Sequence, residues 1–137
     1  GFEDYVIEND ELTVERYPGW YAFQTVAHTF YNRDEFKEPD LEVTASQPLN
    51  MLKAYVHETD AGDELVLMLW NTKGKVDTTI TIASDRFAYA TEVDLFDMNK
   101  WSDVPYRVVD GGVEIDVKAD VTPRIIRLVD RNLIERN

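Results

Sequence analysis

The side chains that could do chemistry in this chain are mostly carboxylates, because its 137 residues include 27 Asp and Glu but only 14 Lys and Arg. Hydrolysis of a glycosidic bond needs two carboxyl groups held at a defined separation across a sugar ring, and Asp94 and Asp97 stand close together at the end of a predicted strand. Asp60, Asp63 and Glu64 crowd one turn and offer the oxygen ligands that Ca²⁺ takes. That turn lacks the full ligand-and-glycine loop of a calcium site, however. Solvation of strand ends explains both groups better in a chain this acidic.

Other residue types that catalyse reactions are scarce. The two histidines, His28 and His57, have no second histidine at metal-ligand spacing, and the chain contains no cysteine. Ser46, Ser84 and Ser102 lie in no Gly-x-Ser-x-Gly context, and no glycine-rich phosphate loop is present. We therefore expect no catalytic residue, no metal and no cofactor in this chain.

Exposed aromatic residues offer a different chemistry, since Trp and Tyr rings stack against sugar faces. Trp101, in the polar segment 99–103 that we interpret as a loop, is the main candidate for such a platform, with Tyr106 and Tyr89 nearby. The alternative is that the Trp101 ring folds over the edge of the domain. Trp70 ends an apolar run and is expected in the core.

The formal net charge of −13 argues against nucleic-acid and membrane partners, because such a surface repels phosphate backbones and anionic headgroups. The acidic residues are dispersed, which is typical of a solvated surface rather than an acidic recognition patch. No apolar run approaches bilayer-spanning length, and no secretion signal stands at the start, so the compartment stays open. The length suits one domain with its own core, and the leading Gly1 suggests a fragment of a longer protein.

One amphipathic helix is predicted in front of a run of strands. Short strands at 5–7 and 12–14, joined by a turn at 9–10, precede this helix, which spans about 18–31. Pro18 suits its first turn. The helix carries one apolar face that we interpret as an interface, made of Trp20, Phe23, Ala27 and Phe30. We expect an acidic segment with this helix at 1–38 and a β domain at 39–137.

From residue 41 the apolar period changes from 3.6 to 2, which indicates strands. We expect short strands at 41–45, 51–58, 65–70, 78–83, 89–96, 106–109, 113–117 and 123–129. The apolar run 65–70 suits a central strand buried on both faces, and Asp110-Gly-Gly112 is a hairpin turn signal. Short strands at near-regular spacing predict a mainly β fold, an antiparallel β-sandwich of jelly-roll or Greek-key type.

The order of these parts resembles the end of the clan A glycoside hydrolases, whose catalytic domain is a TIM barrel. The segment from Pro18 to Ala27 resembles the Pro-x-x-Tyr-Ala-x-x-x-Leu/Val-Ala pattern of their last barrel helix. The segments that resemble strands of their C-terminal sandwich are Leu49–Glu58, Glu64–Trp70, Val93–Asp97 and Pro123–Leu128. The resemblance covers about residues 17–129.

The resemblance implies a non-catalytic accessory β-sandwich of a carbohydrate-active enzyme. It would pack against a catalytic TIM-barrel domain or mediate contacts between subunits as a homo-oligomer. The acid and nucleophile of such enzymes stand at the ends of barrel strands, and no such strands precede residue 17, so no catalytic residue carries over. The second hypothesis is a carbohydrate-binding module that uses the exposed aromatic residues. The third is a small carboxylate-based glycosidase.

Overall fold

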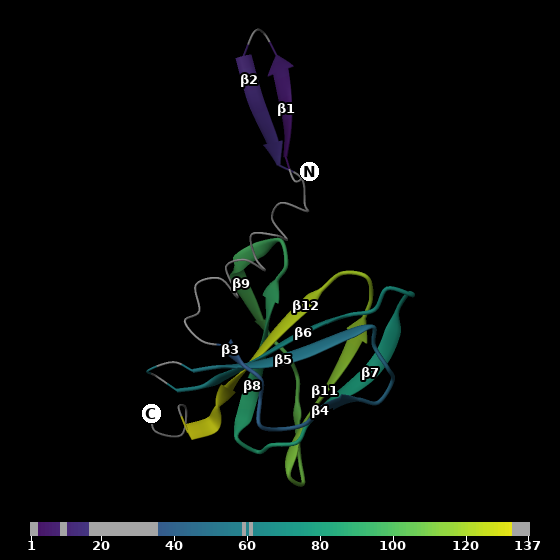
Figure 1. The fold of residues 1–137 in the computed structure, drawn as a ribbon, viewed down its shortest axis with the longest axis vertical. Coiled ribbons are helices and arrows are strands. Elements are labelled where there is room, and N and C mark those ends of the chain that lie inside the picture. Colours follow the sequence, from purple (N-terminus) through teal and green to yellow (C-terminus); the bar gives the residue numbers. More distant parts are fainter. Residues whose placement is uncertain (1–2, 9–10, 17–35, 59, 61, 133–137) are drawn as a thin grey trace.

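The computed structural model describes residues 3–8, 11–16, 36–58, 60 and 62–132. The two strands predicted near the N-terminus are confirmed, and they are β1 (Glu3–Glu8) and β2 (Glu11–Arg16), paired antiparallel (Figure 1). The predicted helix at 18–31 lies outside the described residues, and so do its four interface residues, Trp20, Phe23, Ala27 and Phe30. None of the described residues forms a helix of the length and hydrophobicity needed to span a bilayer.

The other described strands form two antiparallel sheets, which confirms the mainly β prediction. The six-stranded sheet has the order β3-β5-β6-β12-β8-β9, and the four-stranded sheet has the order β10-β11-β7-β4 (Figure 1). The strands of the first are β3 (Phe36–Lys37), β5 (Met51–His57), β6 (Glu64–Trp70), β8 (Phe87–Asp94), β9 (Asp97–Asp103) and β12 (Arg124–Asp130). Those of the second are β4 (Val43–Ala45), β7 (Val76–Ile82), β10 (Arg107–Val109) and β11 (Gly112–Ala119).

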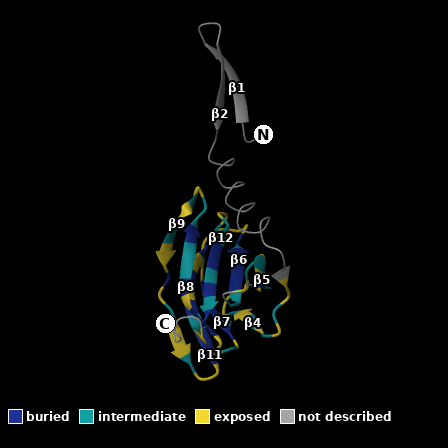
Figure 2. Cartoon of the chain, turned by 90° about the vertical axis from the view of Figure 1, so that its left-hand side faces the viewer, coloured by how far each residue is buried: buried dark blue, intermediate teal, exposed yellow. Residues whose placement is uncertain are grey.

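The main core lies between these two sheets. Alternate residues of a strand share a face, so Leu65, Leu67 and Leu69 of β6 point together into the core, where Ile80 and Ile115 of the other sheet meet them. All five side chains are fully buried, and each contributes about 1.5–3 kcal/mol to the free energy of unfolding. Figure 2 shows the buried residues concentrated on the central strands of the sandwich.

The predicted central strand is confirmed as β6. It lies between β5 and β12, and Val66, which points to the face opposite Leu65 and Leu67, is also buried, at 1% exposed. A strand buried on both faces needs apolar residues at successive positions. The run Leu65–Leu69 supplies them.

The predicted hairpin turn is also confirmed, between β10 and β11. Val109 pairs with Gly112, so Asp110 and Gly111 form a two-residue turn, and Gly111 has a positive φ of 72°, which glycine adopts without steric cost. Gly112 has a different reason to be glycine. A Cβ there would stand 2.4 Å from the backbone oxygen of Ile82 in β7, so only glycine fits against the neighbouring strand.

The structure corrects the prediction at two places. Residues 99–103, interpreted as a loop, belong to the edge strand β9, which pairs with β8. Charged and polar side chains dominate this strand because an edge strand is exposed and is protected from further pairing by charge, so its sequence reads as a loop. The short strand β3 lies between the predicted helix at 18–31 and the first strand predicted after it, at 41–45, where no strand was predicted, and it pairs with β5.

Candidate functional site

The face of the six-stranded sheet that points away from the main core carries a second apolar cluster. Val66 of β6, Ile125 of β12 and Val93 of β8 are exposed by only 1%, 1% and 4%. Ile125 pairs with Val93 and, on its other side, with Met68, so the cluster runs across three neighbouring strands. Half-buried Met68, Leu95 and Trp101 complete it. Among the described residues, all its members come from this sheet and its β8–β9 turn. We call this surface the apolar face.

The outward face of the four-stranded sheet is different, because it is polar. Thr79 of β7 donates a hydrogen bond of 2.8 Å to Asp116 of β11, and Arg107 of β10 donates two more to the same carboxylate, of 2.6 and 3.0 Å. The hydrogen bonds from Arg107, and then that from Thr79, lower the pKa of Asp116 to about 2. An antiparallel sheet with one solvated face has such polar residues there. The apolar face therefore departs from what a solvated outer face requires.

A row of four side chains in successive contact crosses the apolar face from β9 to β5. Its members are Trp101, Arg127, Glu64 and His57. The guanidinium of Arg127 lies 4.4 Å from the centre of the Trp101 ring, a cation–π contact. Its Nη1 lies 3.4 Å from Oε1 of Glu64, and Oε2 of Glu64 lies 3.6 Å from Nδ1 of His57. Strands β9, β12, β6 and β5 each contribute one member. Trp101 is thus tied to the sheet by a charged neighbour as well as by apolar packing.

Two buried polar atoms on this face have no hydrogen-bond partner within the described part of the chain, the Nε of Arg127 and the Oγ1 of Thr91. The two residues pair in register between β12 and β8. An unsatisfied buried polar atom costs about 1–3 kcal/mol. Apolar residues and unsatisfied polar atoms therefore occur together on the same sheet face.

The three predicted carbohydrate-binding residues do not share one surface. Trp101 is half-buried on the apolar face, closer to the alternative of a ring folded against the sheet than to an exposed platform. Tyr89 and Tyr106 do meet, edge to face, with ring centres 6.1 Å apart and an angle of 72°. Tyr106, however, packs against the core between the sheets, on the other side of the six-stranded sheet from Trp101. Sugar binding by these residues stays a prediction. Trp70, expected in the core, is half-buried and belongs to neither buried cluster.

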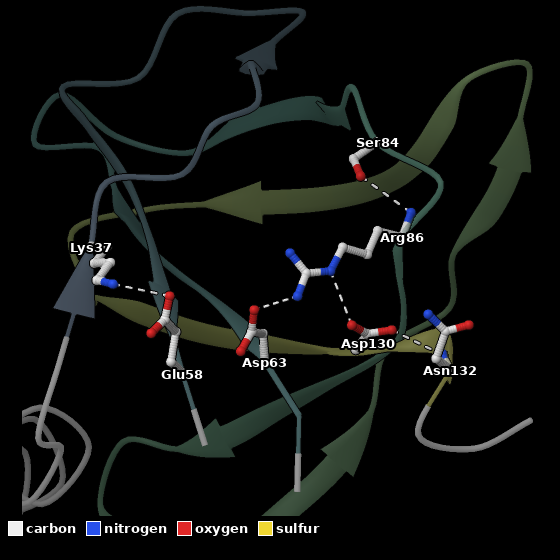
Figure 3. Close-up of polar contacts among 7 residues, drawn as sticks. All are labelled: Lys37, Glu58, Asp63, Ser84, Arg86, Asp130 and Asn132. Carbon is white, nitrogen blue, oxygen red and sulfur yellow. Dashed lines mark hydrogen bonds and ion pairs between the residues drawn. The ribbon is translucent and has the colours of Figure 1, made fainter. Parts of the chain in front are cut away.

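Two of the three carboxylates considered for calcium, Asp63 and Glu64, are engaged with arginines. Arg86, immediately before β8, bonds to Asp63 and, at 2.9 Å, to Asp130 at the end of β12 (Figure 3). Glu64 faces Arg127. In the described ranges, no group of three His, Asp or Glu side chains is placed to hold a metal ion. Arg86 therefore ties together the ends of two neighbouring strands and the turn before β6.

The pair of carboxylates considered for sugar hydrolysis serves the local backbone. Oδ1 of Asp94 accepts a hydrogen bond of 2.9 Å from the backbone N–H of Phe96, and Oδ1 of Asp97 accepts one of 3.1 Å from that of Asn99. Such bonds are typical of Asp in turns. These two oxygens stabilise the β8–β9 turn and its exit.

A pocket beside this turn was not predicted from the sequence. It has a volume of about 350 Å³, and its walls come from β8, the β8–β9 turn, β9 and the start of β12. Phe96 at its rim is 48% exposed. Inside, Arg124 binds the carboxylate of Glu92 through two hydrogen bonds, both of 2.6 Å, and these bonds raise the pKa of Arg124. The one available signal in the sequence was an aromatic residue placed in a turn between two aspartates.

Neither a protein-family model nor a curated protein matches this chain. Among solved structures, the chain is similar to a rhamnosidase from Novosphingobium sp. PP1Y, with 11% sequence identity and a TM-score of 0.48. The similar region covers 80% of this chain and 10% of the rhamnosidase chain. The chain therefore spans about a tenth of that protein's length, and the similarity by itself assigns it no activity. Membership of clan A stays a prediction.

Proposed function

We propose that this chain is a non-catalytic accessory β-sandwich of a carbohydrate-active enzyme that packs against a catalytic TIM barrel through its apolar face. The observation that carries the proposal is the contrast between the two outward faces of the sandwich. One bears the exposed Arg107–Asp116 pair, as a solvated sheet does. The other bears the cluster of Val66, Val93 and Ile125, as a sheet face covered by another layer does.

The choice of a barrel as the covering partner rests on the order of the sequence segments. The segment Pro18–Ala27 resembles a last barrel helix, and four segments that resemble strands of the family's sandwich follow it in the family's order. Half-buried Met68, Leu95 and Trp101 surround the buried centre of the face and are the residues through which a barrel would contact it. Large apolar and aromatic side chains at the centre of an interface supply most of its binding energy.

The test begins with the coding sequence upstream of Gly1, where the proposal expects an in-frame barrel of roughly 300 residues. In that longer product, Met68→Lys should uncouple the sandwich from the barrel, because a lysine in the contact is desolvated without a partner. Scanning calorimetry should then show two separate unfolding transitions in place of one. Limited proteolysis should also cut the connection between the two parts faster.

Thr81→Lys is the matched control, because Thr81 is also a half-buried strand residue. It belongs to the four-stranded sheet, where it pairs with Glu114. It should leave the single transition unchanged. An upstream sequence without a barrel would overturn the proposal, and so would equal effects of the two lysines. Glycosidase activity that persists in the purified chain alone and disappears with one carboxylate replacement would overturn its non-catalytic part.

A further inference from the structure

The pocket beside the β8–β9 turn combines an aromatic ring with polar groups of both signs. The ring of Phe96 stands at its rim in a turn whose backbone is fixed by Asp94, through the 2.9 Å hydrogen bond described above. Ser102 of β9 pairs with Glu92 of β8, and Lys100, two residues before Ser102, lies on the same side of the strand. The pocket thus places a hydroxyl, an ammonium group and carboxylates next to an exposed ring.

The polar lining is held in place before any ligand arrives. The two 2.6 Å hydrogen bonds from Arg124 fix the plane of the Glu92 carboxylate, and Arg124 also donates a 3.2 Å bond to the backbone oxygen of Lys118 in β11. Both side chains are only 25% exposed. Arg124 therefore bridges the two sheets, so Glu92 sits on a rigid part of the sandwich. A rigid lining lowers the entropic cost of binding.

We propose that this pocket binds one ring of an uncharged sugar, with the apolar face of the ring stacked on Phe96 and its hydroxyls bonded to the polar lining. Carboxylates of Asp94 and Glu92 accept from sugar hydroxyls, while Lys100 and Ser102 donate. The charges of the lining balance, since two carboxylates stand against Lys100 and Arg124, which favours a neutral ligand over a charged one. The volume of about 350 Å³ is at the small end of ligand pockets, about 300–1,000 Å³, and suits a single sugar ring.

The choice of sugar as the ligand class rests on the proposed function. The pocket shares Val93 and Leu95 with the apolar face used for docking, but Phe96, Lys100 and Ser102 line the pocket and do not belong to that face. The probes are the methyl glycosides of glucose, galactose, mannose and xylose, titrated into the whole chain labelled with ¹⁵N. At least one should shift the backbone resonances of Phe96, Lys100 and Ser102 in a saturable way. The affinity expected for one ring with one stacking contact is millimolar.

Phe96→Ala should weaken binding of that glycoside about tenfold, because it removes the ring from an exposed turn without opening the core. Phe96→Tyr keeps the ring and should bind within about twofold of the original chain. Val108→Ala is the matched control, because Val108 is a large apolar residue that is 59% exposed and lies outside the pocket. It should leave binding unchanged.

Three results would overturn the sugar pocket. They are no saturable shifts with any glycoside, undiminished binding by Phe96→Ala, and equal losses with Phe96→Ala and Val108→Ala. None of these bears on docking to a barrel, which the Met68→Lys and Thr81→Lys pair tests separately. Conversely, failure of the docking test would leave a measured glycoside affinity intact.

Discussion

Replacing Gly112 by alanine is expected to destabilise the sandwich, because a methyl group there meets the backbone of the neighbouring strand. The new Cβ would stand 2.4 Å from the oxygen of Ile82 and 3.4 Å from its carbonyl carbon. An ordinary carbon–oxygen contact is about 3.3 Å, so β7 and β11 would have to separate locally by roughly 0.9 Å. Val113 pairs with Ile82 at this point, so the separation would strain the hydrogen bonds between the two central strands of the four-stranded sheet.

The expected loss in the free energy of unfolding is about 1–3 kcal/mol, the usual cost of overpacking. Alanine also restricts the unfolded chain, which offsets about 0.4–1 kcal/mol, so the net loss falls in the lower part of that range. For a domain of this size, 1 kcal/mol lowers the melting temperature by about 3–4 °C. Thermal and urea unfolding followed by circular dichroism should therefore show a melting temperature about 3–8 °C lower and a lower urea midpoint.

Gly111→Asn is the matched control, one residue earlier in the chain. Gly111 has φ 72°, and a Cβ added to it would meet no atom within 4 Å; asparagine tolerates that backbone conformation. Its effect should stay within about 0.5 kcal/mol, the usual range for surface substitutions. The reasoning from close backbone approach fails if Gly112→Ala unfolds like the original chain, or if Gly111→Asn is the more damaging of the two.

Two further predictions concern charged pairs. Arg86→Met should lower the free energy of unfolding by about 1–2 kcal/mol, because Asp130, only 8% exposed, loses its charged partner; an unchanged urea midpoint would contradict this. The depressed pKa of Asp116 means that its ionised form stabilises the fold above the ordinary Asp pKa, a contribution that is lost as pH falls toward about 2. Asp116→Asn should flatten the dependence of urea stability on pH between about 4 and 2; an unaltered slope would contradict the role of the Arg107 pair.

The strands that the sequence predicted well are those whose partners cover them on both sides or whose turns demand particular residues. Strand β6 is apolar at successive positions because both faces are buried, and Asp110-Gly111 marks a turn because few residues adopt its backbone. Strand β9 was missed because an edge strand is exposed, so its pairing with β8 imposes no apolar alternation. Its aromatic residue, Trp101, therefore looked like a loop aromatic.

The candidate sites were harder to predict because each is assembled from distant segments. Glu92 and Arg124 are 32 residues apart, and they meet only because β12 inserts between β6 and β8. The same insertion places Arg127 over Trp101 and next to Thr91. No local pattern encodes which strands become neighbours, so the pocket and the row of four side chains on the apolar face could not be read from spacing.

Sequence alone determined that this chain is acidic, mainly β and built from short strands, because composition and local periodicity follow directly from residue type. The same is true of the turn at Asp110-Gly111. Only the tertiary structure decided which outward face is apolar, since a strand's alternation says that its two sides differ but not what covers each side. Only the tertiary structure likewise brought Phe96 to the rim of a pocket lined by Glu92 and Arg124. Those two features depend on the order of strands in the sheet, which is set by packing across the whole domain.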